Sequence, residues 1–233
     1  MARLKAKVIT KATRRPPRGK WPPDAARVRS IVHELEELYP DVDCELDRDS
    51  PFQLICATIL SAQCTDERVN KVTPELFRRY PTAQTMARAP LPTLEGIIRS
   101  TGFYKQKAKS LKGTASILLE KFSGEIPKTI AELTTLPGVA RKTANVVLGT
   151  AFGIAEGVVV DTHIQRLSMR LGLTRSAEPK GIEQDLMRVF PREVWIRIGH
   201  QIIWHGRRVC FARKPNCAGC TLAPFCPSAG LEG

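Results

Sequence analysis

Two residues near the middle of the chain carry side chains suited to nucleophilic or acid–base chemistry, Lys142 and Asp161. Lys142 falls in the first turn of a helix expected after the turn at 136–139. The positive end of the helix dipole and the neighbouring Arg141 both favour a neutral amine there, and a neutral amine is a nucleophile. Asp161 directly precedes a helix expected from Thr162, so its carboxylate could orient a water or the amine, or stabilise a developing cation.

Each of these residues also has a common structural explanation. A lysine in the first turn of a helix is most often solvated or bound to phosphate, and an aspartate before a helix is most often an N-cap. Neither residue taken alone predicts catalysis. The interpretation therefore depends on the segments that position them.

A tight turn containing Gly138 connects a short helix expected at 129–134 to the helix that carries Lys142. Glycine suits the positive φ that such a turn needs. Two helices joined this closely expose the backbone N–H groups at the second N-terminus, which form an anion site. The net charge of +13 and the sequence pI of about 9.7 also predict an anionic partner, so the expected anion is a phosphate of nucleic acid.

The segment LPGVARKTANVVL (136–148), followed by VVVDTH (158–163), resembles the helix-hairpin-helix and catalytic loop of the endonuclease III family of DNA glycosylases. The resemblance runs from about residue 24 to 226 and implies that Lys142 attacks the sugar while Asp161 assists. It also implies that the hairpin binds DNA through Leu136, Gly138, Val139, Ala140 and Arg141. Ala140 departs from the family pattern, which usually has a second glycine there, and we expect its methyl group to hold the backbone slightly farther from the phosphate.

Two loops receive a functional interpretation from the same resemblance. Gln63 in SAQCTD and Phe103 in TGFYKQK match the positions of residues that wedge into the duplex and fill the gap left by an everted nucleotide. Lys105 and Lys107 would then lie near phosphates. The structural alternatives are that Gln63 caps a helix carbonyl and that Phe103 is a buried anchor of its loop.

Four cysteines near the C-terminus have the spacing C-x6-C-x2-C-x5-C: Cys210, Cys217, Cys220 and Cys226. A segment this short cannot bury a core of its own, so thiolates closing on a metal centre would fold it. A zinc site with four cysteine ligands is the generic alternative, although zinc sites usually show two C-x2-C pairs. The resemblance implies a [4Fe–4S] cluster, with Arg213 and Lys214 on the outer face of the loop near phosphate.

The remaining chain predicts an all-α fold, because apolar residues recur at helical spacing and only 158–160 is β-like, which is too short for a sheet. The resemblance implies two helical domains that flank a DNA-binding cleft. We expect a continuous domain at 44–154 that ends in the hairpin, and a cluster domain formed by 24–43 with 155–233. Residues 1–23 are basic, lack acidic side chains and are expected to be a disordered arm. Helices are expected at 24–40, 51–62, 66–80, 82–89, 93–100, 105–122, 162–171, 179–190 and 194–208.

The sequence and the resemblance together predict a monomeric, bifunctional DNA glycosylase and AP lyase. It would remove oxidised pyrimidines from duplex DNA, and cut damaged or abasic strands by β-elimination through a lysine Schiff base. No transmembrane or secretory pattern is visible, so a bacterial cytoplasm is expected, with an organelle or nucleus ranked lower. Two alternatives stay open: an adenine-mismatch glycosylase, against which Lys142 argues, and a DNA-binding module without catalysis.

Overall fold

The computed structural model describes residues 21–231, and its regular structure in that range is entirely helical. The all-α prediction is therefore confirmed for this part of the chain. Most of the basic arm expected at 1–23 lies outside the described residues. No helix within 21–231 is long and apolar enough to cross a membrane.

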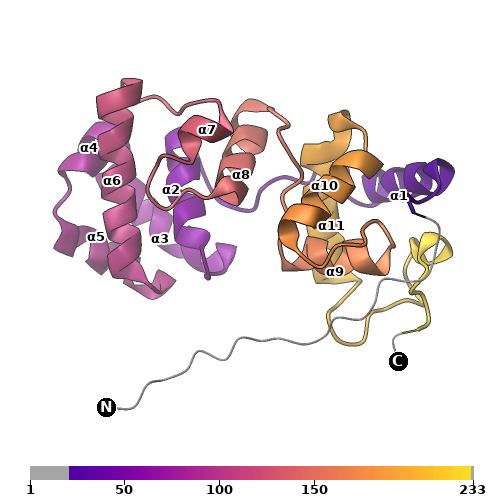
Figure 1. Ribbon diagram of the computed structural model, residues 1–233. Helices are drawn as coiled ribbons and strands as arrows, with labels where there is room; N and C mark the ends of the chain where they lie inside the picture. Colours follow the sequence, from indigo (N-terminus) through magenta and orange to yellow (C-terminus); the bar gives the residue numbers. More distant parts are fainter. Residues whose placement is uncertain (1–20, 232–233) are drawn as a thin grey trace, which may run out of the picture.

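The helices form two groups, which lie side by side in Figure 1. The first helical group is continuous in sequence and contains α2 to α8. Its elements are α2 (Pro51–Ser61), α3 (Asp66–Arg79), α4 (Ala83–Arg88), α5 (Leu91–Ile98), the 3-10 turn η1 (Arg99–Thr101), α6 (Tyr104–Phe122), α7 (Ile130–Leu133) and α8 (Arg141–Phe152).

Helix α2 lies at the centre of the first helical group. Ser50 caps it by accepting a hydrogen bond from the Gln53 N–H at 3.2 Å, and Pro51 occupies the first turn, where no N–H is required. Every residue from Phe52 to Leu60 is buried, so the helix has no solvated face. It packs against α3, α6 and α8, and thereby connects the wall of the group to the helix that carries Lys142.

The second helical group combines the start of the chain with its last third. It contains α1 (Ala25–Leu38), α9 (Thr162–Arg170), α10 (Pro179–Val189), η2 (Arg192–Val194), α11 (Trp195–Arg208) and η3 (Ala223–Phe225). Arg27 on α1 donates to the carbonyls of Leu171 at 2.7 Å and Phe225 at 2.9 Å, and Tyr39 hydrogen-bonds His205 Nδ1 at 3.2 Å. These contacts place the N-terminal helix against the C-terminal segment (Figure 1).

Buried apolar residues divide between the two groups in the same way, with one cluster at 46–148 and another drawn from 28–39 and 158–222. The exact domain limits given above stay a prediction. Helix boundaries agree with the expected ones to within about two residues. The largest difference is α5, which begins at Leu91 because Pro92 is accommodated in its first turn.

Candidate active site

A cleft of about 410 Å³ lies between the two helical groups. Lys142 and Thr143 on α8 line it from the first group, and Asp161 at the start of α9 lines it from the second. Gln63, in the loop after α2, lies at the same cleft. The structure thus brings together both residues that the sequence singled out for chemistry, although 18 residues separate them.

The turn before Lys142 has the geometry of an anion-binding hairpin. Helix α7 is a single turn capped by Thr129, and the chain then reverses through Gly138, whose φ is +81°. A Cβ at Gly138 would lie 3.0 Å from the Ser110 side chain, so both the conformation and the space require glycine. Leu136 and Val139 are buried beneath the turn, so any contact they make with DNA must come from their main chain.

Ala140 is the N-cap residue of α8 and supplies no side-chain hydrogen bond to the helix. Its φ of −86° and ψ of 170° are open to any residue, so the alanine causes no backbone strain. Because no side chain caps α8, the first N–H groups of the helix are left for a ligand. The expected effect of the methyl group on phosphate distance stays a prediction.

Asp161 is the N-cap of α9, where its Oδ1 accepts a hydrogen bond from the Ile164 N–H at 2.8 Å. The structural explanation considered for this residue is therefore correct, but it does not exclude a role in the cleft. A carboxylate has a second oxygen, and the cap fixes the orientation of the group at the cleft wall. Capping and chemistry are compatible in one side chain.

A buried carboxylate joins the two groups next to Lys142. Glu183 on α10 accepts hydrogen bonds from Arg141 Nε at 3.2 Å and from Asn145 Nδ2 at 3.0 Å. Gly157, in the loop leading to Asp161, passes so close that a Cβ there would lie 2.1 Å from Glu183 Oε1. Glu183 therefore fixes the helix of Lys142 and lies directly against the loop that leads to Asp161. Sequence reasoning missed it, because an isolated glutamate on an amphipathic helix gives no signal of burial.

The loop residues expected to wedge into DNA have unusual backbones. Gln63 and Phe103 adopt left-handed conformations, with φ of 54° and 47°. Phe103 is 67 % exposed, so its interpretation as a buried anchor is wrong. No hydrogen bond involving the Gln63 side chain is present among the described residues, so the proposed carbonyl cap is not observed. Lys105 is exposed on the first turn of α6.

Lys107 requires a correction, because it does not lie on the surface near a prospective phosphate. Its side chain is buried, and Nζ donates hydrogen bonds to the carbonyls of Leu60 and Thr101, each at 2.8 Å. Burial lowers the pKa of the Lys107 ammonium. The residue is thus an internal connection between loops and not a direct DNA contact.

A further cation connects the groups at the cleft, where it was not anticipated from the sequence. Arg207 on α11 forms ion pairs with Glu45, in the segment before α2, and with Asp66 at the start of α3. All three residues line the cleft. With the Glu183 contacts, this arrangement gives the two groups polar connections at two separate places.

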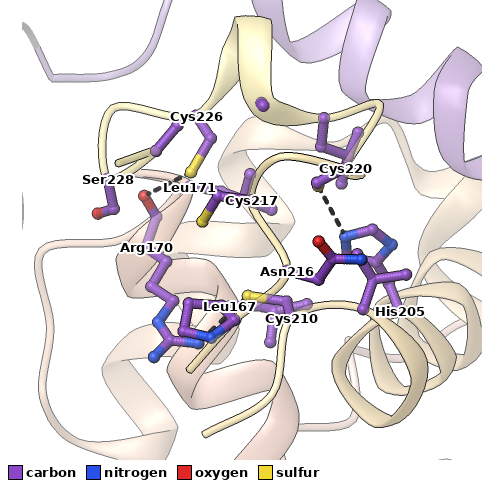
Figure 2. A pocket seen from close by; sticks show the side chains of 15 residues that line it. Leu167, Arg170, Leu171, His205, Cys210, Asn216, Cys217, Cys220, Cys226 and Ser228 are labelled. Carbon is purple, nitrogen blue, oxygen red and sulfur yellow. Dashed lines mark hydrogen bonds between the residues drawn. The ribbon is translucent and has the colours of Figure 1, made fainter. Parts of the chain in front are cut away.

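The four C-terminal cysteines line one pocket between α9, α11 and the last segment of the chain (Figure 2). Arg170 Nη1 donates to Cys210 Sγ at 3.2 Å, and His205 Nε2 lies 3.4 Å from Cys220 Sγ. Burial raises the pKa of the Cys220 and Cys226 thiols, and the neighbouring cysteines raise it further. Arg213 and Lys214 are exposed on the loop between the first two cysteines.

The thiols of this pocket do not converge on a single point. Within residues 21–231, no three His, Cys, Asp or Glu side chains are placed to hold one metal ion. Four cysteines around a common pocket nevertheless provide the donor set of a larger, thiolate-bound centre. His200 and His205 both lie on α11, and His205 lines this pocket. His205 is hydrogen-bonded to Tyr39, and burial lowers the pKa of both histidines.

Comparison with known proteins identifies the class first. Residues 56–192 match the HhH-GPD superfamily of base excision DNA repair proteins. The chain is also 56 % identical over 203 residues to endonuclease III of Synechocystis sp.. That alignment covers 87 % of this chain and 93 % of the relative. The chain is 42 % identical to endonuclease III of Escherichia coli K12, over 86 % of this chain and 95 % of the relative.

Among solved structures, the chain is similar to a non-covalent endonuclease III–DNA complex, with a TM-score of 0.82 and 42 % identity over 88 % of this chain and 95 % of that one. A trapped endonuclease III–DNA covalent intermediate matches equally well, with a TM-score of 0.82 over 88 % of this chain and 96 % of that one. The chain belongs to the endonuclease III family of DNA glycosylases and AP lyases.

Proposed function

We propose that this chain removes oxidised pyrimidines from duplex DNA and cuts the strand at the resulting abasic site. The observation that carries the proposal is the position of Lys142 and Asp161, which reach one cleft from opposite helical groups. A nucleophile and a carboxylate on facing walls can act on the two sides of a sugar placed between them. A protein with this substrate works where the genome lies, which in a bacterium is the cytoplasm.

Lys142 acts as the nucleophile in its neutral form. Its amine forms a bond to C1′ of the sugar while the bond from C1′ to the base breaks, and the base leaves with the electron pair and gains a proton. The Asp161 carboxylate stabilises the positive charge that develops on the sugar. The amine then loses a proton and the C1′–O4′ bond breaks, with its electron pair and a proton going to O4′, which leaves a protonated Schiff base between Lys142 and C1′. Loss of a C2′ proton from that Schiff base expels the 3′ phosphate by β-elimination.

Three surfaces bind the DNA backbone in this proposal. The N–H groups at the start of α8 take one phosphate, since they lack a side-chain cap and face the hairpin turn. Lys105 on α6, together with Arg213 and Lys214 on the cysteine loop, adds exposed positive charge. Arg141 is half-exposed, so its guanidinium can reach a phosphate while it remains paired with Glu183.

Gln63 and Phe103 enter the duplex beside the everted nucleotide. Flipping a base costs a few kcal/mol of unstacking, and an inserted apolar ring offsets part of that cost. Phe103 is exposed enough to do this, and its left-handed backbone is the kind of local strain that concentrates at functional sites. Gln63 lies at the cleft itself, where an amide could hydrogen-bond the base left without a partner.

Cys210, Cys217, Cys220 and Cys226 hold a [4Fe–4S] cluster in this proposal. The common pocket and the spacing C-x6-C-x2-C-x5-C, which has only one C-x2-C pair, support a multi-iron centre over tetrahedral zinc. The cluster would fold the last segment of the chain and place Arg213 and Lys214 against DNA. Assays for iron, acid-labile sulfide and zinc on the purified protein decide between the two centres.

Borohydride trapping tests the catalytic proposal. The protein and its Lys142→Gln variant are each incubated with a duplex containing one thymine glycol, and covalent adducts are separated by denaturing electrophoresis. We expect an adduct with the native protein and none with the variant. Base release without an adduct would indicate a monofunctional glycosylase, and tight binding with neither would indicate a DNA-binding module; both results would contradict the proposal.

A further inference from the structure

Lys107 is a buried cation whose partners are main-chain atoms. It lies one turn into α6 and is 5 % exposed, and its Nζ donates to the Leu60 and Thr101 carbonyls at 2.8 Å each. No carboxylate within the described part of the chain pairs with it. A buried ammonium without a counter-ion is costly, so its presence requires an interaction that an apolar side chain could not supply.

The two carbonyls belong to the two loops proposed to enter DNA. Leu60 is in the last turn of α2, three residues before Gln63, and Thr101 ends η1, two residues before Phe103. Carbonyls at helix ends lack intrahelical donors. The Lys107 ammonium therefore supplies a donor to each loop at the point where its backbone turns toward a left-handed residue.

We propose that Lys107 is a positioning residue that fastens the Gln63 loop to the Phe103 loop, so that both side chains enter the duplex as one rigid unit. This inference rests on the wedge role given to these loops in the proposed function. Two separately mobile loops would each lose conformational freedom on insertion, whereas loops already fixed to each other lose less. The left-handed backbones of Gln63 and Phe103 also persist only if the surrounding structure holds them in place.

The decisive variant is Lys107→Met, which replaces most of the apolar stem of the side chain and removes both hydrogen bonds. The matched control is Lys112→Met. Lys112 is on the same helix, and its Nζ also donates to a main-chain carbonyl at 2.8 Å, but that carbonyl is Ala89, away from both loops. The two substitutions therefore remove the same kind of contact, and only one of them frees the wedge loops.

Single-turnover excision of thymine glycol is measured for the native protein, Lys107→Met, Lys112→Met, Phe103→Ala and the double variant Lys107→Met/Phe103→Ala. Cleavage of a preformed abasic site is the second readout. We expect Lys107→Met to slow excision about tenfold, Lys112→Met to change it less than about twofold, and abasic cleavage to fall much less than excision. In the Phe103→Ala background, Lys107→Met should slow excision less than it does in the native protein, because one of the two side chains it positions is already absent.

Several results would overturn the inference. The first is that Lys107→Met excises at the native rate, and the second is that it loses excision and abasic cleavage equally. The third is that the double variant slows excision by the product of the two single-variant factors, which would mean that the two residues act independently. If Phe103→Ala excises at the native rate, both the wedge role of Phe103 and the inference that rests on it are wrong. Borohydride trapping of Lys107→Met on an abasic site tests the Lys142 chemistry separately. If trapping is retained, a failure of the Lys107 inference leaves the Lys142 proposal intact. If the methionine variant does not fold, Lys107→Gln takes its place, because a shorter amide cannot reach both carbonyls.

Discussion

The helical group that carries Lys142 and the group that carries Asp161 differ in what holds each of them together. In the first, α2 is buried on all sides and packs directly against α8, so the hairpin rests on an apolar core, and Thr114 adds a hydrogen bond to the Pro137 carbonyl at 2.9 Å. In the second, the chain after α11 contains only one three-residue 3-10 turn within the described range, and its cysteines surround a pocket. One wall of the cleft is specified by side-chain packing, whereas the other has a packed core and, in our proposal, also a cysteine segment that needs a bound centre to fold.

Loss of a cysteine ligand gives the largest expected difference between the walls. Cys217→Ser should lose iron and leave the amides of residues 209–231 unprotected in hydrogen exchange, while amides of α2 and α6 keep their protection. The reason is that most backbone hydrogen bonds of this segment close short turns, and that Leu222 is the one fully buried side chain among residues 209–231. Cys56→Ala is the control, since Cys56 is fully buried in the first group and away from the pocket. Equal protection in both regions would contradict the comparison.

A cavity in the first wall should produce a smaller effect of a different kind. Leu54 is fully buried on α2, so Leu54→Ala should lower the free energy of unfolding by about 2–5 kcal/mol, measured by denaturant titration. Iron content should stay at the native level, because the cysteine pocket is elsewhere. Leu38→Ala, at a partly exposed site on α1, serves as control with an expected change below about 0.5 kcal/mol.

The connection between the walls is tested at Glu183. Glu183→Gln weakens the hydrogen bonds from Arg141 and Asn145, and we expect a loss of about 1–2 kcal/mol in stability, reduced from the fully buried value because Arg141 is half-exposed. Trapping by Lys142 should slow at saturating DNA. Glu156→Gln removes a surface ion pair to Arg192 and should change neither quantity measurably. A Glu183 variant with native trapping would show that the walls are positioned independently.

The smallest effect is expected at the tip of the hairpin, which is part of the first wall. Ala140→Gly should change stability by less than about 0.5 kcal/mol and the DNA dissociation constant by less than about threefold, because Ala140 is exposed and its backbone is unstrained.

Gly138→Ala, two residues earlier, should lower the free energy of unfolding by about 1–2 kcal/mol, since φ is +81° and the added Cβ would crowd the Ser110 side chain. Fluorescence anisotropy on an abasic-site duplex measures the affinity of both variants.

The sequence was sufficient for the helices and for the meeting of Lys142 with Asp161, since both depend on local patterns and a recognisable motif. It was insufficient for Lys107, although this lysine shares the helical stripe of Leu111 and Leu118. Lysines are so seldom buried that a lysine in an apolar stripe is still predicted to be exposed. Glu183 and Arg207 were missed for another reason: their partners are distant in sequence, so only the packing of the two groups determines which acidic and basic side chains meet.

The position of α1 has a consequence for how the chain assembles during synthesis. The first group is complete once the ribosome has passed α8, so its core can close while the rest is still being made. Helix α1 cannot do this, because its Arg27 pairs with the Phe225 carbonyl 198 residues later. Its apolar stripe stays uncovered until α11, which packs against it, has emerged. A chain that has not yet reached α11 therefore carries the nucleophile without a packed opposite wall.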